Sequence, residues 1–328
     1  MNYEETKKAF TSLFNHEMSN TQMRDFLLSV KLDKSTSAQS ISAAAEVMRS
    51  YAILLPIQDN LRASVIDIVG TGGDKIGSFN ISSAVSILVA SCGSFVAKHG
   101  SRSVTSKSGS ADLFEELGIR LDLSIENSAK LLQESGFTFM FAANYHPAMK
   151  FIMPIRKTIE DKTIFNILGP LTNPAGAKKS LIGVFDKSFV TKMAEALQDS
   201  GSTSVMVVSS KERMDEISIS DITYAAQFSG GALKEFIIDP EQHRIKKAPL
   251  EAIVGGDSKE NAKILYDIFG GTATDAQRDI VLINAAAALM VDGLARDFQD
   301  GLEMAKEAIE KGKAKEKLKN IIEISNKL

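Results

Sequence analysis

The spacing of apolar side chains predicts a helical unit at the start of the chain. Residues 23–30 and residues 41–48 both carry apolar side chains at positions i, i+3, i+4 and i+7, which lie on one face of an α-helix. Glycine is absent from residues 1–69, and a stretch without glycine suits packed helices. The first sixty residues are therefore predicted to be helical.

From residue 64 onward the pattern changes to short apolar runs that alternate with helical stretches. The candidates for buried strands are residues 65–69, 95–97, 180–185 and 204–208. The candidates for the helices that follow strands are residues 82–90 and 189–200. Apolar runs of this length are typical of parallel strands that are covered on both faces. The alternation predicts an α/β fold, a large domain with a central, mainly parallel sheet flanked by helices, beside a small all-helical domain.

Other segments refine this outline. Residues 147–176 contain four of the seven prolines, which predicts short helices and turns. A polar helix is predicted to begin near Ser110, where Asp112 and Glu115 have the spacing of a capping box. The C-terminal part is strongly helical, and its lysine-rich residues 311–319 are interpreted as a solvated helix face.

Composition sets limits on function and location. The 328 residues allow two domains, or one large domain with a satellite. A formal net charge of −3 provides no basic field for nucleic acid, so an anion site must be local. Cys92 is the only cysteine, which excludes an internal disulfide, and four scattered histidines argue against a Cys/His zinc site. No apolar run reaches the ~18 residues that span a bilayer, and the polar N-terminus lacks a signal-peptide core. We therefore expect a cytoplasmic protein that binds neither membrane nor nucleic acid.

A glycine-rich segment follows the first predicted strand and precedes a helix. Residues 70–83 read GTGGDKIGSFNISS. Glycines allow a backbone to approach a ligand closely, and amides ahead of a helix bind anions. A dinucleotide fingerprint needs glycine where Lys75 stands, and a P-loop needs lysine after Gly77, where this chain has serine. The segment is interpreted as an anion-binding loop, and a tight turn without a ligand is the alternative.

A second segment of similar character follows the second predicted strand. Residues 98–110 read KHGSRSVTSKSGS, with six hydroxyls, three Lys or Arg cations, two glycines and one apolar side chain. A solvated loop can have this composition, but the position between a buried strand and a helix favours anion binding. Two such loops in one α/β unit indicate a ligand with more than one phosphate.

The adjacent carboxylates Asp215 and Glu216 form a third candidate site. They follow the predicted strand at residues 204–208. Vicinal carboxylates on a loop can hold Mg²⁺, which retains several waters and bridges substrate phosphates. Acidic pairs are also common on protein surfaces, so the pair is informative only together with the two anion loops.

Taken in order, several motifs resemble those of the anthranilate phosphoribosyltransferases of tryptophan biosynthesis. The motifs are GTGGD…FNIS, KHGSRSVTSKSGSAD, HPAM…PIR, TIFNILGPLTNPAG, MDEIS, GGDSKENA and INAAAAL. The resemblance runs from about Asp67 to the C-terminus. It implies transfer of the 5-phosphoribosyl group from phosphoribosyl pyrophosphate (PRPP) to the anthranilate amine, with Mg²⁺ as cofactor and no dedicated acid or base residue.

The family architecture implied has two domains. The helical domain comprises residues 1–64 with an insertion from about 147–178, and the α/β domain comprises residues 65–146 and 179–328. The family is usually a homodimer joined through the helical domains. An amidotransferase subunit of anthranilate synthase is a further candidate partner.

The resemblance also implies which residues bind each ligand. The PRPP-binding positions are Gly70, Gly73, Asp74, Ser78, Asn80, Ile81, Ser82, Ser83, Lys98, His99, Gly100, Ser101, Arg102, Ser103, Val104, Thr105, Ser106 and Ser110. The magnesium ligands are Ser82, Asp215 and Glu216. The anthranilate-binding positions are Gly70, Ser101 and Arg156, and His146, Pro147 and Gly169 line the approach. A guanidinium such as that of Arg156 can pair with the substrate carboxylate. His99 and His146 can equally be structural histidines.

The chain departs from the family pattern at three places. Ser101 stands where the family motif KHGN has an asparagine that contacts the acceptor. Residues 209–216 read SSKERMDE in place of HG-x-DGLDE, and the loss of two glycines is expected to alter this loop. Residues 220–223 read SDIT, without the usual Gly-Pro. These changes leave the PRPP motifs and both carboxylates intact and affect the acceptor geometry.

Two other functions are compatible with the same fold. A pyrimidine nucleoside phosphorylase is one, but phosphorolysis has no pyrophosphate–magnesium unit for the second loop and the acidic pair to hold. A nucleic-acid-binding paralogue without catalysis is the other, but it needs a basic groove, whereas this chain is net acidic.

Overall fold

The protein is described by a computed structural model that covers residues 1–103 and 107–328. The strands are β1 (Val65–Gly70), β2 (Phe95–Gly100), β3 (Phe137–Phe141), β4 (Lys179–Gly183), β5 (Ser204–Ser210), β6 (Thr223–Ser229) and β7 (Ala232–Ile238). They form one seven-stranded sheet in the order β3-β2-β1-β4-β5-β6-β7. Strands β1 to β5 run parallel to one another, β6 pairs antiparallel with β5, and β7 pairs antiparallel with β6. The predicted α/β fold with a mainly parallel sheet is confirmed.

Helices precede, separate and follow the strands. The first four are α1 (Tyr3–Phe14), α2 (Asn20–Ser29), α3 (Ala38–Ser50) and α4 (Asp59–Ser64). Those in the middle of the chain are α5 (Ile81–Ser91), α6 (Ser110–Glu116), α7 (Ile125–Ser135), α8 (Ala142–Tyr145), α9 (Met149–Arg156), α10 (Phe165–Leu168) and α11 (Val190–Asp199). The last four are α12 (Ser258–Gly270), α13 (Asp275–Asp292), α14 (Phe298–Glu310) and α15 (Lys313–Lys327). Short 3-10 turns are η1 (Gly169–Leu171), η2 (Lys187–Phe189), η3 (Pro240–His243) and η4 (Leu250–Ile253).

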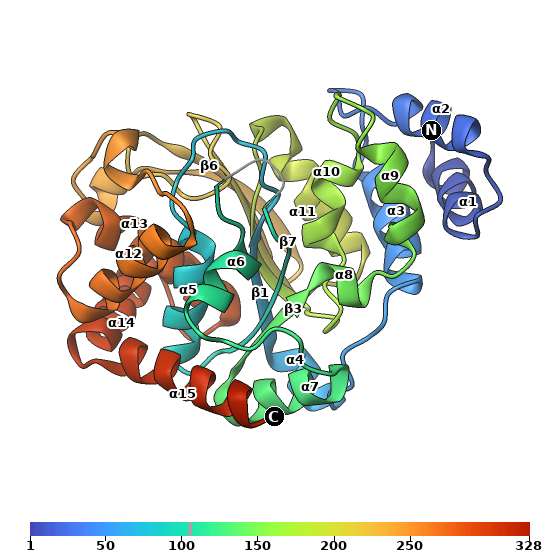
Figure 1. Ribbon diagram of the computed structural model, residues 1–328. Helices are drawn as coiled ribbons and strands as arrows, with labels where there is room; N and C mark the ends of the chain where they lie inside the picture. Colours follow the sequence, from blue (N-terminus) through green and yellow to red (C-terminus); the bar gives the residue numbers. More distant parts are fainter. Residues whose placement is uncertain (104–106) are drawn as a thin grey trace.

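Two groups of helices cover the sheet (Figure 1). Helices α5 and α12 to α15 gather on one side, and α1 to α3 with α9 to α11 gather on the other. Alternate residues of β4 and β5 point to opposite faces of the sheet, and each face packs in its own apolar core. Leu181 and Met206 belong to one core, and Ile182 and Val207 belong to the other. Burial on both faces explains why these strands are continuous apolar runs in the sequence.

The parallel register brings the carboxyl ends of the strands to one edge of the sheet. Gly70 at the end of β1 pairs with Gly183 at the end of β4, and Gly183 pairs with Val208 of β5. On the other side of β1, Gly100 of β2 pairs with Phe141 of β3. Loops that leave these ends therefore meet at this edge, where open α/β sheets bind their ligands.

Local predictions have mixed outcomes. The short helices and turns expected in residues 147–176 are present as α9, α10 and η1, with Pro154 inside α9. The capping box expected from Asp112 and Glu115 is wrong. Helix α6 begins at Ser110 with Gly109 as N-cap, and Asp112 accepts the Gly109 N–H, while Glu115 pairs with a loop arginine. Across the described part of the chain, no helix combines the length and apolarity needed to cross a bilayer.

Candidate functional site

The glycine-rich loop leaves β1 at the carboxyl edge of the sheet and leads into α5. Gly72, Gly73 and Gly77 have φ angles of 68°, 77° and 75°, in the left-handed region that favours glycine. Lys75 shares this conformation with a φ of 65°. Repeated left-handed residues curl the backbone, and a curled backbone forms concave groups of amides that suit an anion.

Asp215 and Glu216 approach this loop from the segment that follows β5. A Cβ atom at Gly183 would lie 1.6 Å from the Asp215 carbonyl oxygen, and one at Gly70 would lie 2.2 Å from Asp215 Oδ2. Glycine is therefore required at both strand ends for the acidic segment to reach the sheet. Gly183 is not among the predicted site residues, although a glycine inside an apolar strand run is a signal of close approach.

Two backbone amides hold the carboxylates in place. The Gly72 N–H donates to Asp215 Oδ2 at 2.7 Å, and the Ser82 N–H donates to Glu216 Oε1 at 3.1 Å. Because the Ser82 amide lies in the first turn of α5, the positive end of the helix dipole favours the charge of Glu216. The Glu216 carboxylate, which is distant in sequence, therefore lies at the start of α5.

Negative charge accumulates around the acidic pair. Burial, reinforced by the Asp74 carboxylate, raises the pKa of Asp215 to about 7. Burial and the repulsion from Asp215 raise the pKa of Glu216 well above its usual value. Lys98 is the neighbouring cation: its Nζ donates to Ser82 Oγ at 3.1 Å and to a β1 carbonyl at 2.5 Å. Burial lowers the pKa of Lys98, and the attraction of Asp67, Glu216 and Asp215 opposes that shift. Several carboxylates therefore share one ammonium group, a setting that suits a divalent cation.

The donor set fits a Mg²⁺ ion that is shared with substrate phosphates. Within residues 1–103 and 107–328, no group of three or more His, Cys, Asp or Glu side chains is arranged to hold a metal by itself. Magnesium commonly takes one or two protein carboxylates and completes its octahedron with waters and phosphate oxygens. Asp215 and Glu216 supply that number of carboxylates, and the Ser82 hydroxyl adds a neutral oxygen beside them.

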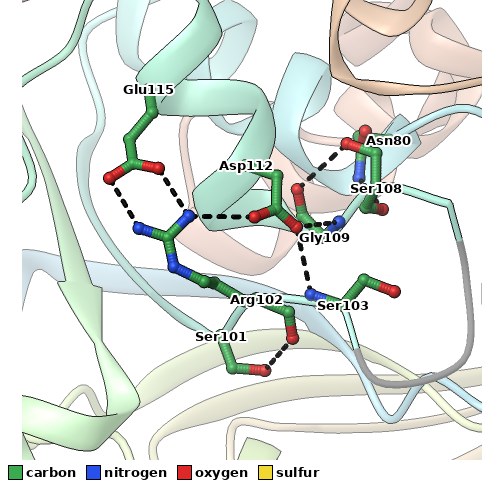
Figure 2. Close-up of polar contacts among 8 residues, drawn as sticks. All are labelled: Asn80, Ser101, Arg102, Ser103, Ser108, Gly109, Asp112 and Glu115. Carbon is green, nitrogen blue, oxygen red and sulfur yellow. Dashed lines mark hydrogen bonds and ion pairs between the residues drawn. The ribbon is translucent and has the colours of Figure 1, made fainter.

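The second loop holds several of its own polar groups internally (Figure 2). The Arg102 guanidinium donates to both oxygens of Glu115, at 2.5 and 2.7 Å, and to Asp112 Oδ1 at 3.0 Å. Asp112 Oδ2 accepts the N–H groups of Ser103 at 3.1 Å and Gly109 at 2.8 Å. The Arg102 guanidinium and the Ser103 N–H, both predicted to bind PRPP, therefore donate to carboxylates of α6 in this structure.

Asn80 connects the two loops to a segment near the C-terminus. Its Nδ2 donates to the Ser108 carbonyl at 3.1 Å, and its Oδ1 accepts from Asn261 Nδ2 at 2.8 Å. Asn261 is buried, and its Oδ1 accepts the Gly256 N–H at 2.8 Å. The GGDSKENA motif at residues 255–262 therefore supports the orientation of Asn80. Asn261 is missing from the predicted site, although its motif was among those that carried the resemblance.

His99, His146 and Gly169 lie together beside the end of β2. The His99 Nδ1 atom is 3.3 Å from the Gly169 carbonyl oxygen, and the two imidazole centroids are 5.1 Å apart. Burial lowers the pKa of His99 to about 3 and that of His146 to about 4, so both rings are neutral at pH 7. Both Nε2 atoms are buried without a hydrogen-bond partner among the described residues. A Cβ at Gly169 would meet no atom within 4 Å, so open space borders this group.

Arg156 at the end of α9 is a half-buried cation. Its guanidinium lies 3.9 Å from Met153 Sδ and 5.8 Å from the centre of the Phe165 ring. Burial alone lowers its pKa, since no carboxylate of the described chain is paired with it. A desolvated guanidinium in this state is suited to the carboxylate of a ligand. Ser101, predicted for the same ligand, is exposed, and its hydroxyl donates to the Arg102 carbonyl at 3.0 Å.

Lys162 joins the segment before α10 to the glycine-rich loop. Its Nζ donates to the Gly73 carbonyl at 2.8 Å and lies 3.2 Å from the centre of the Phe185 ring. Its backbone carbonyl accepts the Leu32 N–H at 2.9 Å. Lys162 therefore ties the helical region to the loop. Lys162 is not among the predicted site residues, because a single lysine in the sequence carries no signal of such a contact.

The segment before the acidic pair forms its turn without glycine. Arg213 occupies the position of the second glycine in the family pattern and adopts a φ of 72°. A non-glycine residue in this conformation costs roughly 1–2 kcal/mol. The Arg213 guanidinium also pairs with Asp186 at 3.1 Å.

The remaining predicted residues are distributed around these features. Ile81 and Ser83 are buried in the first turn of α5, Gly100 ends β2, and Ser110 begins α6. Ser78 forms an isolated bridge with Val254. Pro147 follows His146 and is exposed. Val104, Thr105 and Ser106 lie outside the described residues.

A cavity lies away from these loops. Its volume is about 610 Å³, and its lining includes Tyr3, Glu46, Arg49 and Ser200. Ser200 follows α11 and precedes β5, so this cavity borders the amino-terminal edge of the strands. The convergence of glycines, carboxylates and Lys98 at the opposite edge makes that edge the candidate site.

Comparisons with known proteins place the chain beside one family. The glycosyl transferase family a/b domain matches residues 62–315. An anthranilate phosphoribosyltransferase of Xanthobacter autotrophicus is 40% identical over 325 residues, which are 99% of this chain and 93% of that protein. One of Methanobrevibacter smithii is 40% identical over 326 residues, 99% of this chain and 96% of that protein.

Solved structures show the same similarity. The anthranilate phosphoribosyltransferase of Thermus thermophilus superposes with a TM-score of 0.90 at 33% identity, covering 99% of this chain and 96% of that one. The Saccharomyces cerevisiae enzyme in complex with PRPP and Mg superposes with a TM-score of 0.88 at 25% identity, covering 100% of this chain and 94% of that one. The similarity therefore extends over nearly the whole chain.

Proposed function

The chain belongs to the anthranilate phosphoribosyltransferase family, and from this premise we propose that it transfers the 5-phosphoribosyl group of PRPP to the amine of anthranilate. Pyrophosphate is released, and the reaction is the second step of tryptophan synthesis from chorismate. The observation that carries the proposal is the convergence of the glycine-rich loop, Lys98 and the pair Asp215–Glu216 at one edge of the sheet. The yeast relative in complex with PRPP and Mg supports the same ligands.

PRPP is assigned to the two loops at residues 70–83 and 98–110. The curled backbone of the first loop offers amides to an anion, and the start of α5 adds the positive end of its dipole. Lys98 contributes a buried ammonium group beside the Ser82 hydroxyl. Because these groups are held before the ligand arrives, little reorganisation is needed when it binds.

Magnesium is assigned to Asp215, Glu216 and the Ser82 hydroxyl. When bound, the ion supplies neutralisation of the charge that develops on the departing pyrophosphate. The chain holds the two carboxylates ready for it through the Gly72 and Ser82 amides. Burial raises the pKa values of both carboxylates and repulsion between neighbouring carboxylates raises them further; a bound cation would relieve that repulsion, which supports this assignment.

Anthranilate is assigned to Arg156, Gly70 and Ser101, with His146, Pro147 and Gly169 along its approach. The guanidinium of Arg156 pairs with the substrate carboxylate. The described residues provide no acidic partner for Arg156, so the substrate provides it. This pairing orients the amine towards the ribose. The open space beside Gly169 supports an aromatic ring at this position.

The chemistry needs no dedicated acid or base. The anthranilate amine attacks the anomeric carbon, a C–N bond forms, the bond from that carbon to the pyrophosphate oxygen breaks, and the configuration inverts. The amine is neutral at pH 7, and the proton it loses after attack passes to water. His99 and His146 have pKa values lowered to about 3 and about 4, which makes both rings weak bases. Positioning and electrostatic stabilisation therefore supply most of the rate.

The wider assignments are also carried by the family. We assign a helical domain of residues 1–64 with 147–178, and an α/β domain of residues 65–146 and 179–328. The Phe10 and Phe165 rings, whose centroids are 5.4 Å apart, and the hydrogen bond from the Leu32 N–H to the Lys162 carbonyl support this grouping. A homodimer and an amidotransferase partner follow from the resemblance alone, whereas the cytoplasmic location follows from the sequence features described above.

One assay tests the proposed reaction. Purified protein is mixed with anthranilate, PRPP and Mg²⁺, and the loss of anthranilate fluorescence is followed. Loss is expected only when all three are present. No loss with the complete mixture would contradict the proposal, and phosphorolysis of a pyrimidine nucleoside by the same sample would establish the alternative activity.

A further inference from the structure

Asp112, which is not among the predicted ligand-binding residues, connects the two ends of the second loop. It lies in the first turn of α6, and one of its oxygens, Oδ2, accepts two backbone N–H groups that are six residues apart in the chain (Figure 2). One belongs to Ser103 at 3.1 Å, and the other to Gly109 at 2.8 Å. The carboxylate therefore joins the outgoing and returning ends of the loop.

The two loop ends are packed closely enough to need this junction. A Cβ at Gly109 would lie 2.4 Å from the Ser103 nitrogen and 2.8 Å from the Ser101 carbonyl oxygen. The Ala111 N–H also donates to the Ser101 carbonyl at 3.3 Å. The loop is thus closed at its base by a glycine contact, by a helix amide and by the Asp112 carboxylate.

The charge of Asp112 is maintained by its partners. Partial burial acts to raise its pKa, but the Gly109 and Ser103 amides and the Arg102 guanidinium outweigh it and hold the pKa below its usual value. An ionised carboxylate accepts backbone amides more strongly than a neutral group does. The junction is therefore formed at neutral pH.

Resting on the proposed function, we propose that Asp112 is a positioning residue for PRPP: by holding the Ser103 and Gly109 amides on one carboxylate oxygen, it fixes these two residues, and with them the neighbouring Ser108, at the place that receives the phosphates. Asp112 does not contact the reacting atoms. It acts through the backbone on either side of the loop and through Ser108, whose carbonyl accepts from Asn80 of the first loop at 3.1 Å.

Glu115 provides a matched control on the same helix. It accepts the Arg102 guanidinium with both oxygens, but no contact links it to Ser103 or Gly109 within the described residues. Its side chain is 44% exposed, and exposed ion pairs contribute little. Glu115→Gln therefore removes one charge from the same cluster and leaves the junction in place.

The test compares Asp112→Ala, Asp112→Asn and Glu115→Gln with the unchanged protein. The Kd of PRPP with Mg²⁺ is measured by calorimetry, and the KM of each substrate is measured by the fluorescence assay. We expect Asp112→Ala to raise the Kd and KM of PRPP at least about tenfold, with the KM of anthranilate changed less than about threefold. Asp112→Asn, which keeps one acceptor oxygen, should show a smaller change in the same direction. Glu115→Gln should remain within about twofold.

Two outcomes overturn the inference. One is an unchanged PRPP Kd in either folded Asp112 variant. The other is an equal loss for both substrates, which indicates a purely structural role. If Asp112→Ala does not fold, Asp112→Asn decides on the same criteria. A protein that binds PRPP but consumes no anthranilate contradicts the proposed function instead, and the calorimetric comparison still tests Asp112.

Discussion

The phosphate side and the acceptor side of the site differ in how their polar groups are satisfied. On the phosphate side, amides, carboxylates and Lys98 are already bonded to one another, as in the pairs Gly72–Asp215 and Ser82–Glu216. On the acceptor side, within the described residues, the Arg156 guanidinium has no carboxylate partner and the Nε2 atom of His146 has no hydrogen-bond partner. The chain fixes these pairs on the phosphate side in advance, whereas it leaves the Arg156 guanidinium without an acidic partner.

The difference follows from what each side has to bind. A polyphosphate and a cation carry high charge, so the groups that receive them must be fixed in advance if reorganisation is to be small. An aromatic acid presents one carboxylate, and a single half-buried guanidinium can meet it. Changes on the phosphate side should therefore impair the whole reaction, whereas changes on the acceptor side should affect mainly one substrate.

The largest effect is expected from Asp215→Ala combined with Glu216→Ala. Loss of a metal site removes several kcal/mol of stabilisation, so kcat/KM should fall on the order of 10³-fold or more. Burial and repulsion raise both pKa values, so the ionised pair does not stabilise the fold at pH 7, and Tm should not fall. Steady-state kinetics at several magnesium concentrations and thermal unfolding provide the measurement. Full activity in the double variant removes the metal site from the account.

Arg156→Ala should have an intermediate effect confined to one substrate. It removes a charge-assisted pair worth on the order of 1.5–3 kcal/mol, so kcat/KM for anthranilate should fall roughly 10- to 150-fold. The KM of PRPP should remain nearly constant, because the Arg156 contacts found in residues 1–103 and 107–328 are with Met153 and Phe165, outside both phosphate loops. Equal losses for both substrates would show that Arg156 does not bind the acceptor.

Ser101→Asn should have a smaller effect on the same side. The serine hydroxyl has one donor where the family asparagine has two, and a bridging water can fill the gap. Anthranilate should remain the acceptor, with KM changed by less than about tenfold, or ~1.4 kcal/mol. The comparison uses anthranilate and substituted benzoates with both proteins. A wild type that ignores anthranilate beside a variant that uses it would point to a different natural acceptor.

Arg213→Gly should have the smallest effect. Relief of the left-handed backbone, roughly 1–2 kcal/mol, is offset by the loss of a mostly exposed ion pair with Asp186 and by the greater freedom of glycine in the unfolded chain. The free energy of unfolding should change by less than about 1 kcal/mol, and kcat/KM by less than about twofold. Denaturant unfolding and the fluorescence assay check both values. A tenfold gain in activity would mean that Arg213 distorts the acidic segment.

The sequence predicts the phosphate side better than the acceptor side. Buried parallel strands appear as apolar runs, and the glycines of residues 70–77 announce a curled loop, so the sheet and the first loop follow from local pattern. Gly70 is among the predicted site residues, and the structure shows why glycine is needed there: a side chain would collide with Asp215. Arg156 entered only through family resemblance, because a lone arginine in a proline-rich segment has no local signature.

What the sequence analysis missed depends on contacts between distant segments. The antiparallel strands β6 and β7 were not predicted, because the register of a sheet edge is not expressed in local composition. Asn261 and Lys162 reach the loops from positions 181 and 89 residues away along the chain. The run FTFMF of β3 is different: it is bounded by Gly136 and could have been recognised as a strand.

The most direct test of the division between the two sides is the affinity of PRPP for the Arg156→Ala variant. Calorimetric titration of PRPP with Mg²⁺ into the variant and into the unchanged protein gives this quantity without requiring catalysis. We expect equal Kd values within about twofold, because the Arg156 contacts found in the described residues lie outside both phosphate loops. A tenfold or greater loss of PRPP affinity would contradict it, since the acceptor arginine would then be part of the phosphate site.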